Sequence, residues 1–426
     1  YPDGQDDYPV GGISWYEAAA YCAFAGKSLP TLHQWYQAAD LFNVEAVVQF
    51  SNFGADGPAP VGHPLRLGAH GTYDMAGNVK EWAWNEATEG RRYVLGGAWN
   101  EASYQFHGWD AQPPRDRKPT YGVRCAIPTG PLPAEQTAPV AAPFVDWRAE
   151  TPVRDEVFAI YKSLYDYDRT PLEPRIDPDR DEFEHWWVER VSFAAAYGNE
   201  RVSALLFLPR NVNPPYQTVM YFPGLGPWLT PSPPPTSFDD LHTDTYWLLG
   251  LVRGGRAVLY PAYKGAFDRH IGSPLLPHIW RDIVIHSAKD LRRAVDYLVT
   301  RSDVDGGKLA HFGISTGAAV GTVMAAVEPR FQASVLLAGG AFPWRHPPEV
   351  EAFNFAPRVR VATLMINGRH DFYYPYETSQ APLFELLGTE KRHKVFESAH
   401  IPAERAEVMR EVLDWLDRYL GPVNRP

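Results

Sequence analysis

A serine between two glycines, in the segment Gly-Ile-Ser-Thr-Gly at 313–317, is the strongest chemical signal in the chain. The pattern G-x-S-x-G places a serine on a tight turn between a strand and a helix. The context agrees, because the apolar run 309–312 precedes the motif and the small-residue run 318–327 follows it. Side chains at the flanking glycines would collide with the neighbouring strand and helix. Ser315 is therefore our candidate nucleophile.

The tripeptide Gly-Ile-Ser also occurs at 12–14, where it has a structural explanation. Ser14 and Glu17 form the S-x-x-E pattern of a capping box, which predicts a helix over 15–24. We therefore expect Ser14 to cap a helix and Ser315 to do chemistry.

A nucleophilic serine needs a base, and the base needs a carboxylate that orients it. In the chain order serine, acid, histidine, the acid follows a late strand and the histidine follows the last one. Asp371 follows the apolar run 362–366, and His400 follows the run 394–397. Asp371 and His400 are therefore the predicted acid and base.

Other histidines and aspartates fit this order less well. His370 adjoins the acid, and His393 precedes its strand. His311 lies in the strand before the serine, where a packed, hydrogen-bonded histidine is expected. Asp268 and Asp282 both precede the nucleophile in the chain.

Acyl transfer also needs N–H donors for the negative oxygen that develops in the transition state. The N–H of Thr316, directly after the nucleophile, is one predicted donor, and the other is expected in the loop after an earlier strand. The loop after the run 218–222 reads Pro-Gly-Leu-Gly at 223–226, and we predict Leu225 as the second donor. An ordinary Gly-Pro turn is the alternative.

Several residues near these motifs are predicted to form the substrate pocket. The predicted pocket residues are Gly224, Trp228, Tyr263 and Tyr374, with Trp280 and Tyr373 as further candidates and the stiff, proline-rich run 230–235 as a wall. Simple packing is the alternative for the aromatic residues.

The elements that must position these residues alternate along the second half of the chain. Short apolar runs predict strands, and amphipathic runs between them predict helices. Strands that alternate with helices favour a mainly parallel sheet covered on both faces, which is a doubly wound α/β fold. The predicted strands are 188–193, 202–208, 218–222, 257–260, 309–312, 333–337 and 362–366, and the predicted helices include 283–300 and 404–420.

These motifs resemble the α/β-hydrolase superfamily, in particular its dienelactone-hydrolase and prolyl-oligopeptidase-like branch, over roughly residues 150–420. The resemblance implies a serine esterase that forms an acyl-enzyme with a small-molecule ester and needs no cofactor. A peptidase-type amide hydrolase and a catalytically degenerate binding module are the alternatives. The HGGG stretch of lipases is replaced here by Pro-Gly-Leu-Gly at 223–226.

The first 128 residues carry a different series of motifs, which resembles the formylglycine-generating enzyme (sulfatase-modifying factor) family. The resemblance implies a smaller, irregular α+β, C-type-lectin-like domain whose family pattern begins upstream of Tyr1. The motifs are Gly-Gly-Ile-Ser-Trp at 11–15, Gly-Lys-Ser-Leu-Pro-Thr at 26–31, Asp-Met-Ala-Gly-Asn-Val-Lys-Glu-Trp at 74–82, Gly-Gly-Ala-Trp at 96–99 and Gly-Val-Arg-Cys at 122–125.

Oxidase activity in that family uses a copper-binding cysteine pair, with one cysteine between the last two motifs. The segment 100–120 has none, and Tyr104, Phe106 and His107 cannot replace a soft thiolate pair. We therefore predict a non-catalytic binding or scaffolding domain. The resemblance also places Asn78 and Glu81 where the family has a calcium site, with a solvated loop as the alternative.

The sequence thus predicts a first domain over 1–128, a Pro/Ala-rich linker over 129–150 and a hydrolase domain over 151–426. This combination resembles the carboxy-terminal part of large bacterial serine/threonine kinases. The resemblance implies an upstream kinase domain or another protein partner of the first domain. No kinase motif occurs in the chain itself.

Charge and cysteine content narrow the partners and the compartment. The 426 residues hold 40 Lys and Arg against 51 Asp and Glu, and this net charge of −11 argues against nucleic acid. No apolar run approaches the roughly 20 residues of a membrane helix, so no membrane is expected. We predict that Cys22 and Cys125 are unpaired, buried small side chains, which is compatible with a cytoplasmic location.

Overall fold

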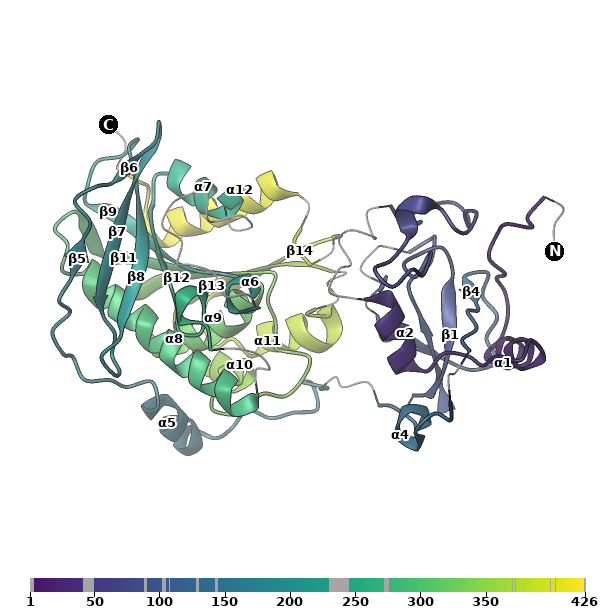
Figure 1. Ribbon diagram of the computed structural model, residues 1–426. Coiled ribbons are helices and arrows are strands. Elements are labelled where there is room, and N and C mark those ends of the chain that lie inside the picture. The colour runs from purple at the N-terminus through teal and green to yellow at the C-terminus, as the bar shows by residue number, and fades with distance from the viewer. Residues whose placement is uncertain are drawn as a thin grey trace. The chain divides into compact units, whose positions relative to one another are not determined.

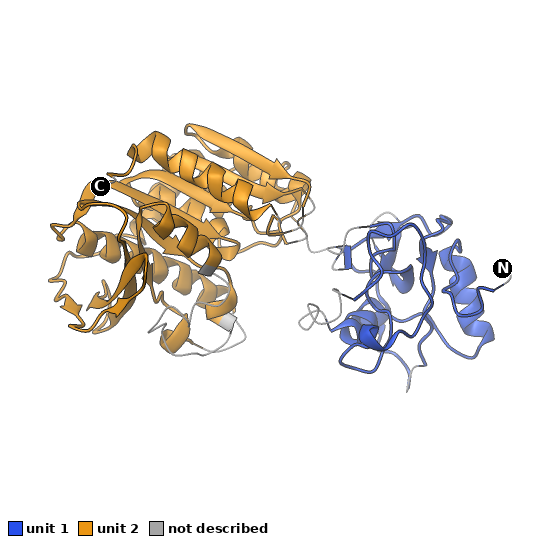
Figure 2. Ribbon diagram, turned by 90° about the horizontal axis from the view of Figure 1, so that it is seen from above, with its two compact units in different colours: residues 1–143 blue, residues 144–426 orange. Residues whose placement is uncertain are grey.

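The computed structural model describes residues 4–40, 50–87, 90–101, 105–106, 108–127, 130–141, 145–229, 245–271, 276–369, 371, 373–398, 400–402 and 404–424 (Figure 1). The chain divides into two compact units, residues 1–143 and 144–426, which are described separately (Figure 2). The boundary falls inside the predicted linker. No helix in the described part combines the length and the apolar character that crossing a membrane requires.

Unit 1 is small and irregular, with helices beside a four-stranded sheet in the order β3-β2-β1-β4. Its helix α1 begins where the capping box predicted: the Ser14 hydroxyl accepts the Glu17 N–H, and the Glu17 carboxylate accepts the Ser14 N–H. The elements are α1 (Trp15–Phe24), α2 (Leu32–Ala39), η2 (Pro64–Arg66), β1 (Lys80–Glu86), β2 (Arg92–Leu95), β3 (Ala111–Gln112), β4 (Tyr121–Gly122) and α4 (Ala134–Thr137).

A disulfide in unit 1 contradicts one of our predictions. Cys22 of α1 and Cys125 are bonded, with their Cα atoms 5.5 Å apart, although 103 positions separate them in the chain. The prediction of unpaired cysteines was wrong because the packing of α1 against Trp82 and Tyr121 brings the two residues together. The prediction of a cytoplasmic location rested on unpaired cysteines and loses that support, since disulfides persist mainly in oxidising compartments.

The described parts of the predicted linker contact both units. Asn85 of β1 donates its side-chain amide to the carbonyl oxygens of Gln136 and Ala138, each at 2.8 Å. Trp147 donates its indole N–H to the carbonyl oxygen of Phe342, also at 2.8 Å. The proline content predicted an extended spacer, but these contacts attach 136–138 to unit 1 and Trp147 to unit 2.

Unit 2 is built on one large sheet in the order β14-β13-β12-β11-β9-β10-β8-β7-β5, with β6 on β7. Strands β9 to β14 pair in parallel, and β5 to β8 add antiparallel pairs at one end. The strands are β5 (Arg175–Ile176), β6 (Asp181–Glu182), β7 (Trp186–Ala194), β8 (Arg201–Pro209), β9 (Tyr216–Phe222), β10 (Ala257–Pro261), β11 (Val304–Ile314), β12 (Phe331–Leu337), β13 (Ala362–Gly368) and β14 (Lys391–Phe396).

Helices cover both faces of this sheet, which confirms the predicted doubly wound α/β fold (Figure 1). Helices α7 and α12 lie on one face, and α8 to α11 lie on the other. The helices are α5 (Asp155–Ser163), α6 (Gly226–Leu229), α7 (Thr245–Arg253), η6 (Phe267–Arg269), α8 (Pro277–Leu298), α9 (Thr316–Val327), α10 (Ala352–Phe355), η7 (Ala356–Arg358), η8 (Tyr376–Gln380), α11 (Ala381–Leu386) and α12 (Arg405–Leu420).

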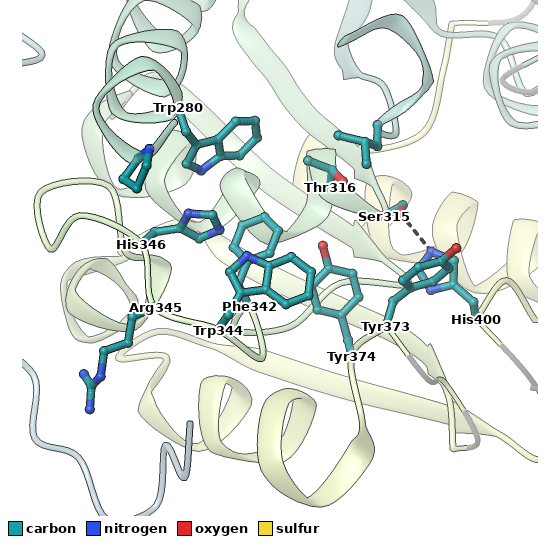
Figure 3. Close-up of a pocket in the computed structure, with 12 residues that line it drawn as sticks. Trp280, Ser315, Thr316, Phe342, Trp344, Arg345, His346, Tyr373, Tyr374 and His400 are labelled. Atoms are coloured by element: carbon teal, nitrogen blue, oxygen red, sulfur yellow. Dashed lines mark hydrogen bonds between the residues drawn. The ribbon is translucent and has the colours of Figure 1, made fainter. Parts of the chain in front are cut away.

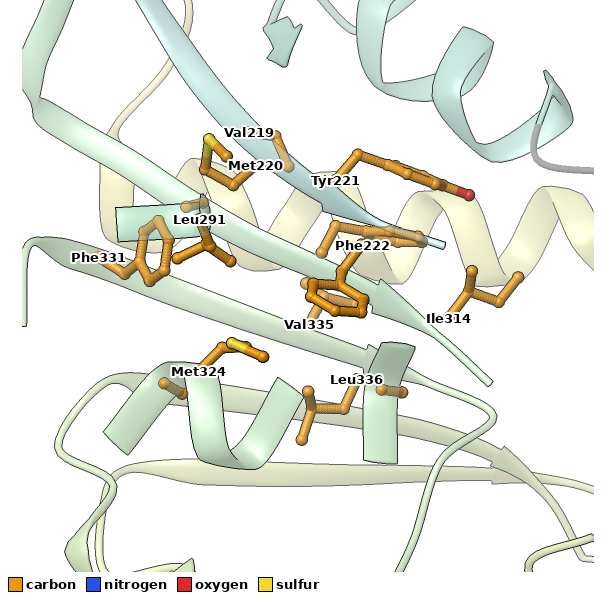
Figure 4. Close-up of a cluster of buried hydrophobic side chains, with 14 of the residues drawn as sticks. Val219, Met220, Tyr221, Phe222, Leu291, Ile314, Met324, Phe331, Val335 and Leu336 are labelled. Carbon is orange, nitrogen blue, oxygen red and sulfur yellow. The ribbon is translucent and has the colours of Figure 1, made fainter. Parts of the chain in front are cut away.

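The core lies on both sides of the central strands, and Figure 4 shows part of it. Val219 of β9, Val335 of β12 and Met324 of α9 have no exposed surface. A sheet covered on both faces favours continuous apolar strands over alternating ones. Because β9, β11 and β13 are parallel, their carboxyl ends meet at one edge, and the loops that carry the predicted site leave from that edge.

Candidate active site

Ser315 occupies a strained turn between β11 and α9. Its backbone has φ +55° and ψ −119°, a conformation that costs a non-glycine residue about 1–3 kcal/mol. Close packing around the turn explains the flanking glycines. A Cβ atom on Gly313 would collide with the carbonyl of Gly317, and one on Gly317 would collide with the carbonyl oxygens of Phe222 and Pro223. The turn therefore holds the serine in one orientation.

The turn aims Ser315 at His400, which follows β14. The Ser315 hydroxyl lies 2.8 Å from Nε2 of His400, and Nδ1 of His400 lies 2.8 Å from a carboxylate oxygen of Asp371 (Figure 3). The three side chains come from loops that follow β11, β13 and β14. This arrangement lets the imidazole take the serine proton at one nitrogen while the carboxylate orients it at the other.

The loop after β13 shields and orients the Asp371 carboxylate. Asp371 is only 3% exposed, and its second oxygen accepts the backbone N–H groups of Tyr373 at 2.8 Å and Tyr374 at 3.0 Å. Gln380 donates its side-chain amide to the carbonyl oxygens of Gly368 and Tyr374, which holds both ends of the loop. The Asp371 carboxylate is therefore held in one orientation.

The loop after β9 passes directly beside the nucleophile. A Cβ atom on Gly224 would lie 3.6 Å from Cβ of Ser315, so this glycine borders the site. The next residue, Leu225, lines the same cavity as Ser315 and Thr316, and its carbonyl accepts the Trp228 N–H as the chain turns into α6. Both predicted oxyanion donors thus belong to segments at the nucleophile.

A cavity of about 550 Å³ opens beside Ser315. Three of the aromatic residues proposed from the sequence, Trp280, Tyr373 and Tyr374, line it. The loop after β12 contributes a group that the sequence analysis missed; the signal was a run of aromatic residues and prolines over 342–348 after an apolar strand. The complete lining is Leu225, Pro277, Trp280, Ser315, Thr316, Phe342, Trp344, Arg345, His346, Tyr373, Tyr374 and His400.

Two predicted pocket residues lie elsewhere. Tyr263 is fully buried and donates its hydroxyl to the carbonyl oxygen of Tyr221. Trp228 is 3% exposed, donates its indole N–H to the carbonyl oxygen of Lys264, and stacks on Phe222. For these two residues the pocket prediction was wrong and the packing alternative holds, because both rings stack on Phe222 of β9. The run 230–235 lies outside the described residues.

The rival histidines and acids have other roles in the described part of the chain. His311 is fully buried, and its Nδ1 lies 3.1 Å from the Ser334 hydroxyl. Burial lowers the pKa of His311 to about 3, so the ring is neutral. His393 bonds the side chain of Asn367, and Asp282 pairs with the neighbouring Arg281. His370 lies outside the described residues.

Tyr374 connects the acid loop to the start of α9. Its side chain lines the same cavity as Thr316, and burial raises the pKa of its hydroxyl. The hydroxyl therefore stays protonated beside the predicted oxyanion donor.

The pair proposed for calcium in unit 1 does not fit that ion. The Glu81 carboxylate accepts a hydrogen bond from Arg124 at 2.7 Å and from the Trp35 indole at 2.8 Å. Both polar ends of the Asn78 side chain bond the backbone of Ala59. A guanidinium at the carboxylate repels a cation. Across the part of the chain that is described, no group of three histidines, cysteines or acids could hold a metal.

The stretch without cysteines in unit 1 is only partly described. Phe106 is buried and packs against Trp35, with ring centroids 6.0 Å apart. Tyr104 and His107 lie outside the described residues.

Comparison with known families identifies unit 1. Residues 2–129 match the sulfatase-modifying factor enzyme 1-like domain, so the chain carries such a domain at its amino-terminal end. The chain is 28% identical to the inactive C-alpha-formylglycine-generating enzyme 2 of Bos taurus over 160 residues, which cover 30% of this chain and 53% of that protein. It is 34% identical to the serine/threonine-protein kinase pkn1 of Chlamydia caviae over 92 residues, which cover 18% of this chain and 14% of that protein. The chain thus spans about half of the first relative and a small part of the second.

Two solved structures that are similar to this chain match it over about two thirds of its length. Acetyl xylan esterase 1 from Thermoanaerobacterium has a TM-score of 0.49 at 16% identity and covers 64% of this chain and 96% of its own. The glucuronoyl esterase from Solibacter usitatus has a TM-score of 0.45 at 14% identity, and the match covers 65% of this chain and 93% of that one.

Proposed function

We propose that unit 2 is a serine hydrolase that cleaves a carboxylic ester through an acyl-enzyme. One observation carries the proposal: two hydrogen bonds of 2.8 Å connect Ser315 to His400 and His400 to Asp371, beside a cavity that can hold a substrate. The strained backbone of Ser315 supports it, because strain of this kind clusters at functional sites.

In the first half of the reaction, Ser315 attacks the carbonyl carbon of the ester while Nε2 of His400 takes its proton. The carbonyl electron pair moves to oxygen, and the N–H groups of Leu225 and Thr316 donate hydrogen bonds to that oxyanion. The carbon–oxygen bond to the alcohol then breaks, and His400 protonates the departing alkoxide. The products of this half are the free alcohol and the acyl group on Ser315.

Water completes the reaction by the same steps. His400 takes a proton from the water as it attacks the acyl carbon, and the Ser315 oxygen leaves and regains its proton from His400. Asp371 stabilises the imidazolium that forms twice. Its fixed position keeps the histidine proton on Nδ1 and leaves Nε2 as the base.

A fluorophosphonate probe and short p-nitrophenyl esters test this proposal. We expect an adduct at Ser315, and we expect Ser315→Ala to abolish labelling and lower kcat at least about 10³-fold. Ser14→Ala is the matched control, because Ser14 ends the same tripeptide and its hydroxyl caps α1. Absence of an adduct at Ser315 would favour the degenerate binding module, and a faster amide than matched ester would favour the peptidase.

For unit 1 we propose a non-catalytic module that binds a protein partner, such as an upstream kinase domain. The absence of cysteines from 100–120 supports this, because the soft ligand pair for copper is missing. A relative that is itself named inactive and a kinase are among the proteins that share the domain. Stoichiometric copper together with oxidation of a peptide cysteine by the purified chain would contradict the proposal.

A further inference from the structure

The wall of the cavity beside Ser315 is a connected series of aromatic rings (Figure 3). Tyr373 and Tyr374 lie next to the His400 ring, with centroids 4.8 Å and 5.9 Å from it. The series continues from Tyr374 to Phe342, whose ring centroid lies 5.8 Å away. Aromatic surface therefore begins at the proposed base itself.

The far end of the cavity extends the same series. The His346 ring lies 4.5 Å from Phe342, 5.5 Å from Trp280 and 6.3 Å from Trp344. Figure 3 shows Phe342 and Trp344 between this end and Ser315. The rings at this end differ in orientation: the angle between ring planes is 89° for Trp280 and Phe342 and 35° for Trp280 and His346. The rings of the wall therefore do not share one plane.

Charged groups at the far end are balanced or neutral. The Arg345 guanidinium pairs with the Glu150 carboxylate and lies over the Trp147 ring. Burial raises the pKa of Glu351, which accepts the backbone N–H of His346, to about 8. Burial also lowers the pKa of His346 to about 4. Near pH 7 this end therefore carries no unbalanced charge.

We infer that the cavity binds an uncharged aromatic group of the ester, with Phe342 and Trp344 as the residues that determine this specificity. The inference rests on the proposed function. A flat ring can make offset-stacked and edge-to-face contacts with these walls, whereas a saturated ring of similar size gains burial alone. A cationic group would lose its hydration without finding a partner charge in the lining, and an anionic group would have to displace Glu150 from Arg345. The cavity volume lies in the range of small-ligand sites.

Two pairs of esters separate the effect of aromaticity from that of size. Methyl 3-phenylpropanoate and methyl 3-cyclohexylpropanoate test the acyl side, and 2-phenylethyl acetate and 2-cyclohexylethyl acetate test the alcohol side. In at least one pair, we expect the phenyl ester to have the higher kcat/KM by about threefold to tenfold. Equal values or a cyclohexyl preference in both pairs would overturn the inference.

A matched pair of tryptophan substitutions tests the assignment to the far wall. Trp344→Leu removes a ring that is 46% exposed, and we expect the phenyl preference to fall below twofold. Trp84→Leu makes the same change at a 38% exposed ring in unit 1, and the preference should remain. A preference that survives Trp344→Leu would show that this ring does not determine it.

Binding to the inactive chain separates this inference from the proposed function. Calorimetry with the Ser315→Ala chain measures the Kd of each ester without turnover, and we expect the phenyl ester of the preferred pair to bind about threefold to tenfold more tightly. Equal Kd values in both pairs would overturn the aromatic preference even where esters are hydrolysed. Failure of both labelling and hydrolysis would instead remove the proposed function.

Discussion

The Asp371 carboxylate lies 2.8 Å from Nδ1 of His400 with one oxygen, while its other oxygen accepts two backbone N–H groups. The carboxylate is thus held from both sides. Because a carboxylate only accepts hydrogen bonds, this contact orients His400 with Nδ1 toward Asp371 and Nε2 toward Ser315.

Replacing Asp371 by asparagine should lower kcat about 10³- to 10⁴-fold with little change in KM. An amide favours the wrong tautomer of His400 and cannot stabilise the imidazolium. Steady-state kinetics on a short ester measure the effect. Asp282→Asn, at an exposed acid paired with Arg281, should leave kcat unchanged. A kcat within tenfold of the original for Asp371→Asn would contradict the assigned role.

Replacing Gly317 by alanine should destabilise unit 2 by about 1–3 kcal/mol, because the new methyl group would overlap the carbonyl oxygens of Phe222 and Pro223. Urea unfolding, followed through the transition of unit 2, measures the change. Gly307→Ala is the control: that glycine is exposed and has room for a methyl group, so the change should stay within about 0.5 kcal/mol. Similar stability of both variants would show that the turn is less tightly packed than we describe.

Glu351 should make the stability of unit 2 depend on pH. Burial raises its pKa from 4.5 to about 8, so between these values the folded chain keeps a proton that the unfolded chain releases. The free energy of unfolding should therefore fall as pH rises through this window, by up to about 1.4 kcal/mol per pH unit from this group. Urea unfolding at pH 5 to 8 measures the slope.

Glu351→Gln is the matched variant for that experiment, because the amide has almost the same shape and does not titrate. Its unfolding free energy should vary less steeply over the same pH range. Parallel curves for the two proteins would mean that Glu351 keeps an ordinary pKa.

The disulfide between Cys22 and Cys125 should leave no titratable thiol in the unfolded, unreduced chain and two after reduction. Replacing both cysteines by alanine should destabilise unit 1 by about 2–5 kcal/mol, because the bond closes a loop across most of that unit. The unfolding transition of unit 2 serves as the internal control. Two thiols before reduction would restore our first interpretation of these residues.

Local patterns predicted the positions of the proposed catalytic residues with little help from the fold. Ser315 lies on a turn whose glycines and flanking strand and helix are contiguous in the chain. Asp371 and His400 follow from chain order, because each comes after a strand of one parallel sheet. The structure brings these three side chains within hydrogen-bond distance of one another. The side-chain orientation of residues that pack against distant parts of the chain was harder to predict.

The aromatic residues show that difficulty most directly. Tyr263 and Trp344 are both aromatic residues in segments that follow strands, yet Tyr263 is fully buried against β9 and Trp344 lines the cavity. Sequence patterns do not distinguish these two residues, because an aromatic ring packs equally well in a core and in a ligand site. Only the path of each loop determines which side its ring faces.

The sequence by itself determined the capped start of α1, the long central strands and the helices α8, α9 and α12 of unit 2, and the turn that carries Ser315. Each leaves a local signature in the chain, either a cap, a turn with glycines or a periodic apolar run, which a linear pattern records. Tertiary structure alone decided the Cys22–Cys125 bond, the pairing of Glu81 with Arg124 and the aromatic wall that includes Trp344. These features join segments that are remote in the chain, and their geometry arises only when each unit folds.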